Sequence, residues 1–283
     1  MTKHRGRITV DGIRIHDPAD FEGMRKAGAL AASILDALCP MVGVGQTTGE
    51  LNRVIEQMVD DAGAKSATIG YRGYPYASCI SVNHVVCHGF PGDKIRKWKN
   101  DPHKRVDDTL LDGDILNVDV TVIVDGWYGD TSRMYVAGKA KPYAKKLIQV
   151  THDSLMRAID VVRPGATFGD IGHAIQTHAE SLRMGVVRDF CGHGLGTVFH
   201  APPNVLHYVQ PVPPPPVLEE GMFFTIEPMI NLGRPDTKVL DDDWTAITVD
   251  KSLSAQFEHS IGVTATGCEV FTLSPKGLFH PTS

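Results

Sequence analysis

The chain has 283 residues, of which 42% are hydrophobic and 22% are charged. This length and composition allow a full hydrophobic core and exclude a mainly disordered protein. The formal net charge of −5 argues against a generally nucleic-acid-binding surface. Five cysteines without a regular framework are typical of free thiols in a reducing cytosol. Because no apolar stretch is long enough to predict a membrane span, we expect a cytoplasmic protein without membrane contact.

Two amphipathic helices are predicted near the start of the chain. Asp17 is the expected N-cap of the first helix and Pro18 its first residue, a pair that favours helix initiation. The second helix is expected to follow Thr47 and to end near Gly63. Its predicted apolar face consists of Leu51, Val54, Ile55, Met58 and Val59.

The segment from Gly45, GQTTGELNRVIEQ, is echoed 120 residues later by GATFGDIGHAIQT from Gly165. Upstream, ILDALCP ending at Pro40 is echoed by AIDVVRP ending at Pro164. A repeat of this length predicts two halves of similar build related by a pseudo-twofold axis. The alternative is chance similarity between two amphipathic helices, which share composition.

The segment NVDVTVIVDGWYGDTS, residues 117–132, predicts a hairpin that carries two aspartates. Alternating valines indicate a half-buried strand, and Asp125-Gly126 predicts a tight turn. In that register Thr121 faces Asp130, so Asp119 and Asp130 become diagonal neighbours roughly 7–8 Å apart. Two like charges on a sheet face near the core are costly, so we expect a positive group between them.

Other polar residues interrupt apolar segments in the same way. Glu227 lies in FFTIEPMI, Glu258 precedes an apolar strand, and His193 and His200 flank a glycine-rich stretch. The four carboxylates Asp119, Asp130, Glu227 and Glu258 match the charge of two divalent ions, and His193 adds one imidazole. Such a set suits Mn, Fe, Co or Zn. Taken singly, each residue also fits a solvated turn, an edge strand or a hydrogen-bonded histidine.

Two further segments stand apart from the predicted elements. KIRKWKNDPHKR, residues 94–105, carries six Lys/Arg and is expected to form a basic surface loop. The alternative is a patch for RNA or a ribosomal surface. The proline tract 211–216 is expected to be a stiff extended connector.

At these residues the chain resembles the type I methionine aminopeptidases, from about Asp17 to Leu273. The motifs that carry the resemblance are GYRGYPYASCISVNHVVCHGFP, NVDVTVIVDGWYGDTS, VVRDFCGHGLGTVFH, MFFTIEPMI and DDWTAITVDKSLSAQFEH. The resemblance implies an α+β pita-bread fold with two pseudo-symmetric halves around a central dinuclear metal site. We expect one peptidase domain over residues 17–273, with halves 17–138 and 139–273. Residues 1–16 would form an N-terminal extension and 274–283 a C-terminal tail.

The resemblance also implies roles for individual residues. The metal ligands would be Asp119, Asp130, His193, Glu227 and Glu258, with Asp130 and Glu258 bridging two divalent ions. His88 would hydrogen-bond the scissile amide and His200 the substrate carbonyl, while Glu227 would help to manage protons. The methionine pocket would be formed by Tyr71, Cys79, Phe199 and Trp244, and Thr68 occupies a position where a pocket cysteine is expected.

The activity implied is removal of N-terminal methionine from nascent chains when the second residue is small. We expect a monomer, and a ribosome contact through the basic loop is the alternative to a solvated loop. The alternatives are an Xaa-Pro aminopeptidase on the same fold and a non-catalytic pita-bread binding protein. The gap between His88 and Asp119, which holds the basic loop, is longer than the usual family pattern.

Overall fold

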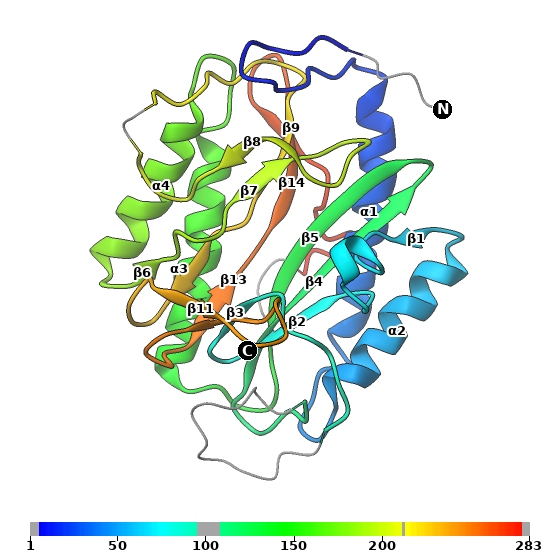
Figure 1. Ribbon diagram of the computed structural model, residues 1–283, viewed down its shortest axis with the longest axis vertical. Helices are drawn as coiled ribbons and strands as arrows, with labels where there is room; N and C mark the ends of the chain where they lie inside the picture. Colours follow the sequence, from blue (N-terminus) through cyan, green and yellow to red (C-terminus); the bar gives the residue numbers. More distant parts are fainter. Residues whose placement is uncertain (1–5, 95–107, 211–212, 279–283) are drawn as a thin grey trace.

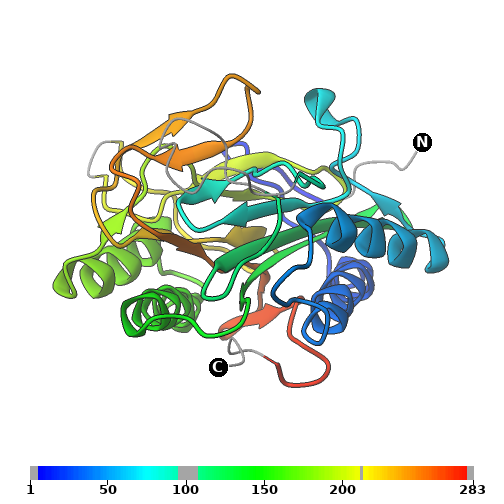
Figure 2. The same cartoon turned by 90° about the horizontal axis from the view of Figure 1, so that it is seen from below.

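The computed structural model describes residues 6–94, 108–210 and 213–278. Within these ranges four α-helices lie on one side of a set of curved β-sheets, and the layers are clearest when the molecule is seen from below (Figure 2). Helices α1 and α2 lie on one flank and α3 and α4 on the other, with the strands between them (Figure 1). No helix of the described chain is long and apolar enough to cross a membrane.

The first helix, α1 (Asp20–Leu38), begins two residues later than predicted. Asp20 N–H donates to Asp17 O over 2.9 Å, and Asp17 N–H donates to Asp20 Oδ2 over 3.0 Å. These reciprocal bonds close a separate turn at Asp17, so Pro18 lies in the turn and not in the helix. Ala19 is the N-cap residue, without a side-chain cap bond.

The sequence echo corresponds to a structural repeat. Helix α2 (Thr48–Asp61) follows α1, and α4 (Phe168–Ser181) follows α3 (Pro142–Asp160). Both α2 and α4 start with a capping box, formed by Thr47 with Glu50 and by Thr167 with Asp170. Both are 14 residues long, so the shared letters encode the same helix start and the same apolar face.

The predicted hairpin is confirmed in its register. Strands β4 (Ile115–Val124) and β5 (Trp127–Val136) pair with Thr121 opposite Asp130 and Asp119 opposite Ser132. Asp125 and Gly126 have φ values of 51° and 86°, the backbone of a tight two-residue turn. Two further strands complete this sheet on the other side of β4, namely β1 (Lys65–Ser66) and β2 (Cys79–Val82).

The largest sheet has five strands in the order β15-β14-β9-β7-β8. Its strands are β7 (Gly192–Gly194), β8 (Ala201–Val205), β9 (Phe223–Ile226), β14 (His259–Val263) and β15 (Cys268–Val270). Two three-stranded sheets have the orders β13-β10-β6 and β11-β12-β3. Their strands are β3 (Val85–Cys87), β6 (Gly185–Val186), β10 (Met229–Asn231), β11 (Thr237–Val239), β12 (Ala246–Thr248) and β13 (Ser254–Gln256). A single 3-10 turn, η1 (Tyr71–Gly73), lies between β1 and β2.

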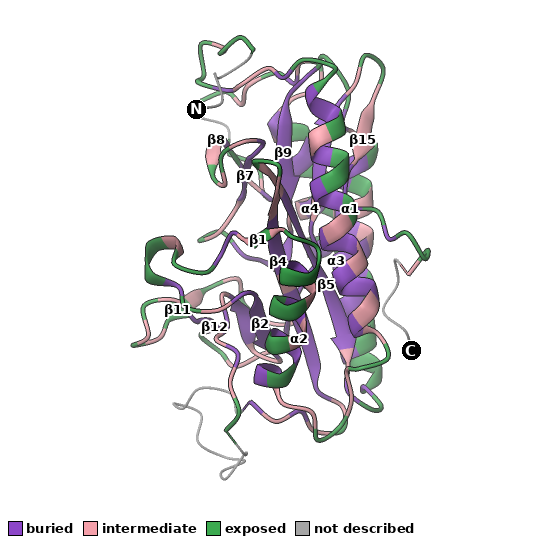
Figure 3. Ribbon diagram, turned by 90° about the vertical axis from the view of Figure 1, so that its right-hand side faces the viewer, coloured by how far each residue is buried: buried purple, intermediate pink, exposed green. Residues whose placement is uncertain are grey.

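The two main sheets are joined near the middle of the molecule. Ser132 on β5 forms an isolated bridge with Glu258, and Thr131 Oγ1 donates to Glu258 O over 2.7 Å. Buried residues fill the strands at the centre and the helix faces that turn toward them (Figure 3). The junction is therefore held between two packed layers, which fixes the strands that carry the candidate site.

Residues 6–16 pack against the five-stranded sheet. Ile15 bridges Met222, His16 N–H donates to Gly221 O over 2.7 Å, and Ile13 is buried in the core. Arg7 forms an ion pair with Glu219. Of the predicted basic loop, all but Lys94 falls outside the described residues, as do two residues of the proline tract.

Candidate metal centre and substrate pocket

The five predicted metal ligands come from five separate segments of the chain. Asp119 and Asp130 lie on β4 and β5, and His193 lies on β7. Glu227 follows the end of β9, and Glu258 directly precedes β14. All five line one cavity of about 830 Å³. The remaining predicted site residues line the same cavity, namely Tyr71, Cys79, His88, Phe199, His200 and Trp244.

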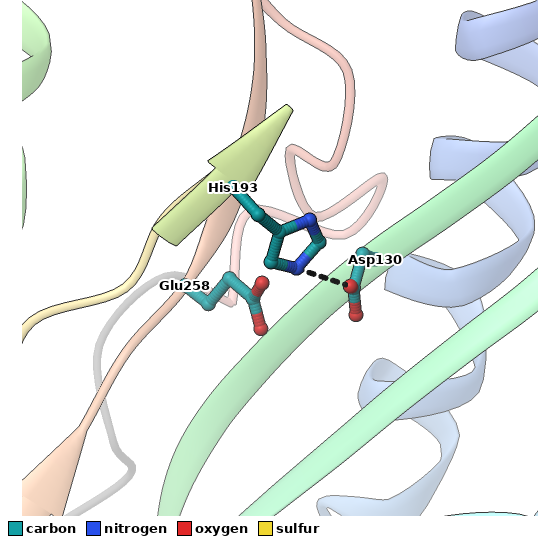
Figure 4. A group of neighbouring side chains, drawn as sticks. All are labelled: Asp130, His193 and Glu258. Atoms are coloured by element: carbon teal, nitrogen blue, oxygen red, sulfur yellow. Dashed lines mark ion pairs between the residues drawn. The ribbon is translucent and has the colours of Figure 1, made fainter. Parts of the chain in front are cut away.

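Three of the ligands converge most closely. One oxygen of Asp130, one oxygen of Glu258 and one ring nitrogen of His193 all lie within 4.8 Å of one another. The three side chains point toward a common centre from β5, β7 and the start of β14 (Figure 4). His193 Nε2 lies 3.5 Å from Asp130 Oδ2 and 3.7 Å from Glu227 Oε1. This spacing leaves room for a cation between donor atoms.

Neighbouring hydroxyl and amide groups orient the carboxylates. Thr121 Oγ1 donates to Asp130 Oδ1 over 2.7 Å, and Thr225 Oγ1 donates to Glu227 Oε1 over 2.8 Å. Gln256 Nε2 donates to Glu227 Oε2 over 3.3 Å. The sequence analysis did not identify these three residues as part of the site. The two threonines could have been found, because the predicted register places Thr121 opposite Asp130 and Thr225 lies two residues before Glu227.

Burial makes the charged form of three of the carboxylates, Asp119, Glu227 and Glu258, costly in the absence of a cation. Burial, and next the charge of Asp130, raise the pKa of Asp119 well above its usual range. Burial also raises the pKa of Glu258 well above its usual range and that of Glu227 to about 7. Burial alone would lower the pKa of His193, but the hydrogen bond to Asp130 and the nearby carboxylates outweigh it and raise that pKa.

The donor chemistry fits divalent metal. Asp119 Oδ1 is buried and has no hydrogen-bond partner within the described part of the chain. Among the described residues that line the cavity, Arg72 is the sole Lys or Arg. It belongs to η1 and forms a cation–π contact with the ring of Tyr71. Oxygen donors with one imidazole, lacking a matching protein cation, are the set that Mn, Fe, Co or Zn binds.

Aromatic rings form the walls of the pocket beside the carboxylates. The ring centroids of Tyr71 and Phe199 are 4.8 Å apart, and those of Tyr71 and His200 are 5.1 Å apart. Trp244 lies with its ring centroid 5.7 Å from that of His88. Cys79, at the start of β2, is buried and faces the same cavity. Sulfur and aromatic surfaces of this kind favour an apolar, polarisable side chain.

Two histidines stand at the border between the pocket walls and the carboxylates. His88 has a φ of 57°, in the left-handed region that non-glycine residues seldom adopt. Burial lowers its pKa to about 4, so the ring is neutral near pH 7 and can both donate and accept a hydrogen bond. The ring of His200 lies 4.1 Å, centroid to centroid, from that of His193. Both His88 and His200 line the cavity.

The sequence profile of metallopeptidase family M24 matches residues 22–265. The chain belongs to metallopeptidase family M24. It is 52% identical over 270 residues to a methionine aminopeptidase of Rickettsia prowazekii (strain Madrid E), covering 95% of this chain and 98% of the relative. The crystal structure of methionine aminopeptidase from Rickettsia prowazekii matches with a TM-score of 0.86 at 51% identity, over 92% of this chain and all of the other.

A more distant solved structure shares the fold. The prolidase from Pyrococcus horikoshii OT3 matches with a TM-score of 0.68 at 19% identity, over 91% of this chain and 63% of that one. At that identity the likeness shows the fold alone. The pita-bread fold predicted from the sequence is confirmed, and the M24 chain is a hydrolase that depends on divalent metal ions.

One residue of the pocket differs from the pattern expected from the resemblance. Thr68 lines the cavity where the resemblance led us to expect a cysteine. Its hydroxyl donates to Tyr76 O over 2.7 Å and lies 3.0 Å from Ser66 Oγ. Because the Thr68 hydroxyl is hydrogen-bonded within the protein, its methyl group is the part of the side chain that can contact an apolar substrate group.

Proposed function

We propose that this protein is an aminopeptidase that removes the N-terminal methionine from peptides and nascent proteins when the second residue is small. The supporting observation is a single cavity that brings an acidic metal centre and an apolar, aromatic wall together. The full-length similarity to a methionine aminopeptidase supports the same activity. The acidic centre matches the free amino terminus of a substrate, because carboxylates and metal ions both interact with an amine.

The proposed ligand arrangement uses all five converging side chains. Asp130 and Glu258 would bridge two divalent ions, Asp119 would complete the site of one, and His193 with Glu227 the site of the other. When bound, such a pair lowers the pKa of a shared water toward neutrality and polarises the substrate carbonyl. The buried, partnerless Oδ1 of Asp119 supports this assignment.

The remaining polar residues would orient the substrate. His88, neutral because burial lowers its pKa to about 4, would hydrogen-bond the scissile amide. His200 would stabilise the carbonyl oxygen as charge develops on it. Glu227 would help to manage protons and to return one to the leaving amine. Tyr71, Cys79, Phe199 and Trp244 would enclose the methionine side chain.

The activity is tested by removing metal. Protein treated with a chelator should lose cleavage of Met-Ala-Ser and regain it with Mn²⁺, Co²⁺ or Fe²⁺. Glu227→Ala should remove nearly all turnover, since a ligand and a proton acceptor are lost together. Full activity after metal removal would contradict the proposed mechanism.

Substrate choice separates the two rival activities. An Xaa-Pro aminopeptidase would cleave Xaa-Pro peptides in preference to Met-Ala peptides, and a binding protein would bind peptide without turnover. We expect cleavage of Met-Ala-Ser and slow or absent cleavage of Xaa-Pro peptides. The reverse preference would favour the Xaa-Pro enzyme.

We further propose that the protein acts as a monomer in the cytoplasm on chains emerging from the ribosome. The basic run 94–105 offers positive charge for such a contact, in an otherwise acidic protein. Neutralising Lys97, Lys99 and Lys104 should reduce co-sedimentation with ribosomes and leave tripeptide cleavage intact. Unchanged co-sedimentation would indicate a solvated loop.

A further inference from the structure

A buried histidine lies directly behind one of the proposed metal ligands. His207 follows the end of β8 and is fully buried, with an exposed fraction of 0%. Its Nε2 accepts a hydrogen bond from the backbone N–H of Glu227 over 3.3 Å. None of the roles assigned to the site so far uses this residue, and it does not line the cavity.

The position of Glu227 in the chain explains why its N–H needs such a partner. Strand β9 ends at Ile226, whose partner His259 is the first residue of β14. Glu227 also precedes Pro228, which holds its backbone extended. The N–H of Glu227 thus falls one residue beyond the strand ladder, and a buried N–H without an acceptor destabilises the fold.

The contact also fixes the state of the imidazole. Nε2 can accept a hydrogen bond only in a neutral ring whose proton is on Nδ1. His207 Nδ1 is buried and has no partner among residues 6–94, 108–210 and 213–278. A buried polar atom without a partner is uncommon in a residue that serves packing alone. Within the described residues the ring therefore makes its hydrogen bond through Nε2, to the N–H of Glu227.

A second contact holds the other end of Glu227. Thr225 is fully buried, and its Oγ1 donates to Glu227 Oε1 over 2.8 Å. The same Oγ1 accepts the backbone N–H of His193 over 3.0 Å. One hydroxyl thereby links the two proposed ligands of a single metal ion. Main chain and carboxylate of Glu227 are each held by a different residue.

We propose that His207 and Thr225 are positioning residues that form a two-point clamp on Glu227 and set its distance from His193. This inference rests on the proposed function, because it assigns Glu227 and His193 to one metal ion. Ligands held in place before binding lose less freedom when metal arrives, so the clamp raises metal affinity.

The test measures metal binding directly, by calorimetric titration of the metal-free protein with Mn²⁺ and separately with Co²⁺. His207→Met removes the acceptor at similar volume, and His207→Gln returns an acceptor oxygen near the position of Nε2. Thr225→Val removes the hydroxyl at nearly constant size. Thr151→Val is the matched control, since Thr151 is equally buried but bonds Leu147 O within α3.

We expect His207→Met and Thr225→Val to weaken the affinity of one metal site by about 10- to 100-fold. His207→Gln should restore much of that loss, and Thr151→Val should bind as the parent does. Thermal unfolding with excess chelator checks that each variant is folded. If His207→Met fails to fold, Thr225→Val tests the clamp by the same titration.

The outcomes separate this inference from the proposed function. Parent-like affinity in a folded His207→Met or Thr225→Val would overturn the clamp and leave the peptidase assignment intact. A parent protein that binds both metals yet does not cleave Met-Ala-Ser would instead overturn the proposed function and leave the clamp intact.

Discussion

Ser260 and Asp130 are joined by a pair of reciprocal hydrogen bonds that tie β14 to β5. Ser260 Oγ donates to Asp130 O over 2.7 Å and accepts Asp130 N–H over 3.3 Å. Since Glu258 lies two residues before Ser260, this contact sets the distance between the two proposed bridging carboxylates. The metal centre therefore depends on a serine that is fully buried and touches no substrate.

Removing this hydroxyl should weaken both the fold and the metal centre. Ser260→Ala is expected to lower the free energy of unfolding by about 1–3 kcal/mol, because it leaves buried backbone groups unpaired. Metal affinity should fall as well, measured by titration. Ser254→Ala is the control, since Ser254 Oγ makes only a 3.5 Å contact with Ile230 O. Equal effects of the two substitutions would contradict the role given to Ser260.

Neutralising Glu227 should stabilise the metal-free protein while weakening metal binding. Burial raises the pKa of Glu227 from about 4.5 to about 7, so the folded state holds a proton that the unfolded state has released. The free energy of unfolding therefore falls as pH rises from 4.5 through 7, and the full cost applies above pH 7.

Glu227→Gln removes that cost. In chelator at pH 8 the substitution should raise the free energy of unfolding by about 1–3 kcal/mol, and at pH 4 it should have little effect. Urea unfolding at both pH values makes the measurement. A destabilised variant at pH 8 would show that the hydrogen bonds of the carboxylate outweigh its charge.

His88 should make the protein less stable in mild acid. Burial lowers the pKa of His88 to about 4, whereas the unfolded chain titrates near the ordinary value of 6.5. The unfolded state then binds more protons between these values, so stability is lost as pH falls from 6.5 toward 4. His88→Gln should flatten this dependence by up to about 1.4 kcal/mol per pH unit. Above pH 7 the free energy of unfolding of the parent and of His88→Gln should change with pH in parallel. Identical slopes below pH 6.5 would contradict a lowered pKa for His88.

Gly196 should not tolerate a side chain. It has a φ of 145°, and a Cβ there would lie 2.7 Å from His16 Cε1. Gly196→Ala is expected to destabilise the protein by about 1–3 kcal/mol. It should also raise KM, since the same loop carries Phe199 and His200. Gly43→Ala is the control, because a Cβ at Gly43 meets no atom within 4 Å. A parent-like KM for Gly196→Ala would show that the loop adapts.

Local signals were enough to predict several elements. The helix start after Thr47, the β4 strand and the Asp125-Gly126 turn depend on signals that act over a few residues, and the structure confirms each. The strand predicted to be half buried is buried on both faces for most of its length. The start of α1 was wrong by two residues, because Asp17 and Asp20 bond each other in a turn. The helix propensity of Pro18 does not distinguish a helix that begins there from a separate turn at Asp17, because both satisfy the same backbone groups.

The sequence by itself determined which residues are chemically out of place: carboxylates in apolar strands need a partner wherever the strands lie. Their charge also suggested a common partner, but only the tertiary structure brings them together, through the β5–β14 contact and the sheet that sets β7 beside β9. The clamp on Glu227 was equally beyond the sequence, because His207 is 20 residues away and looks like any other histidine. Which buried donor pairs with which buried acceptor depends on distances in the folded structure, and no local pattern along the chain encodes these distances.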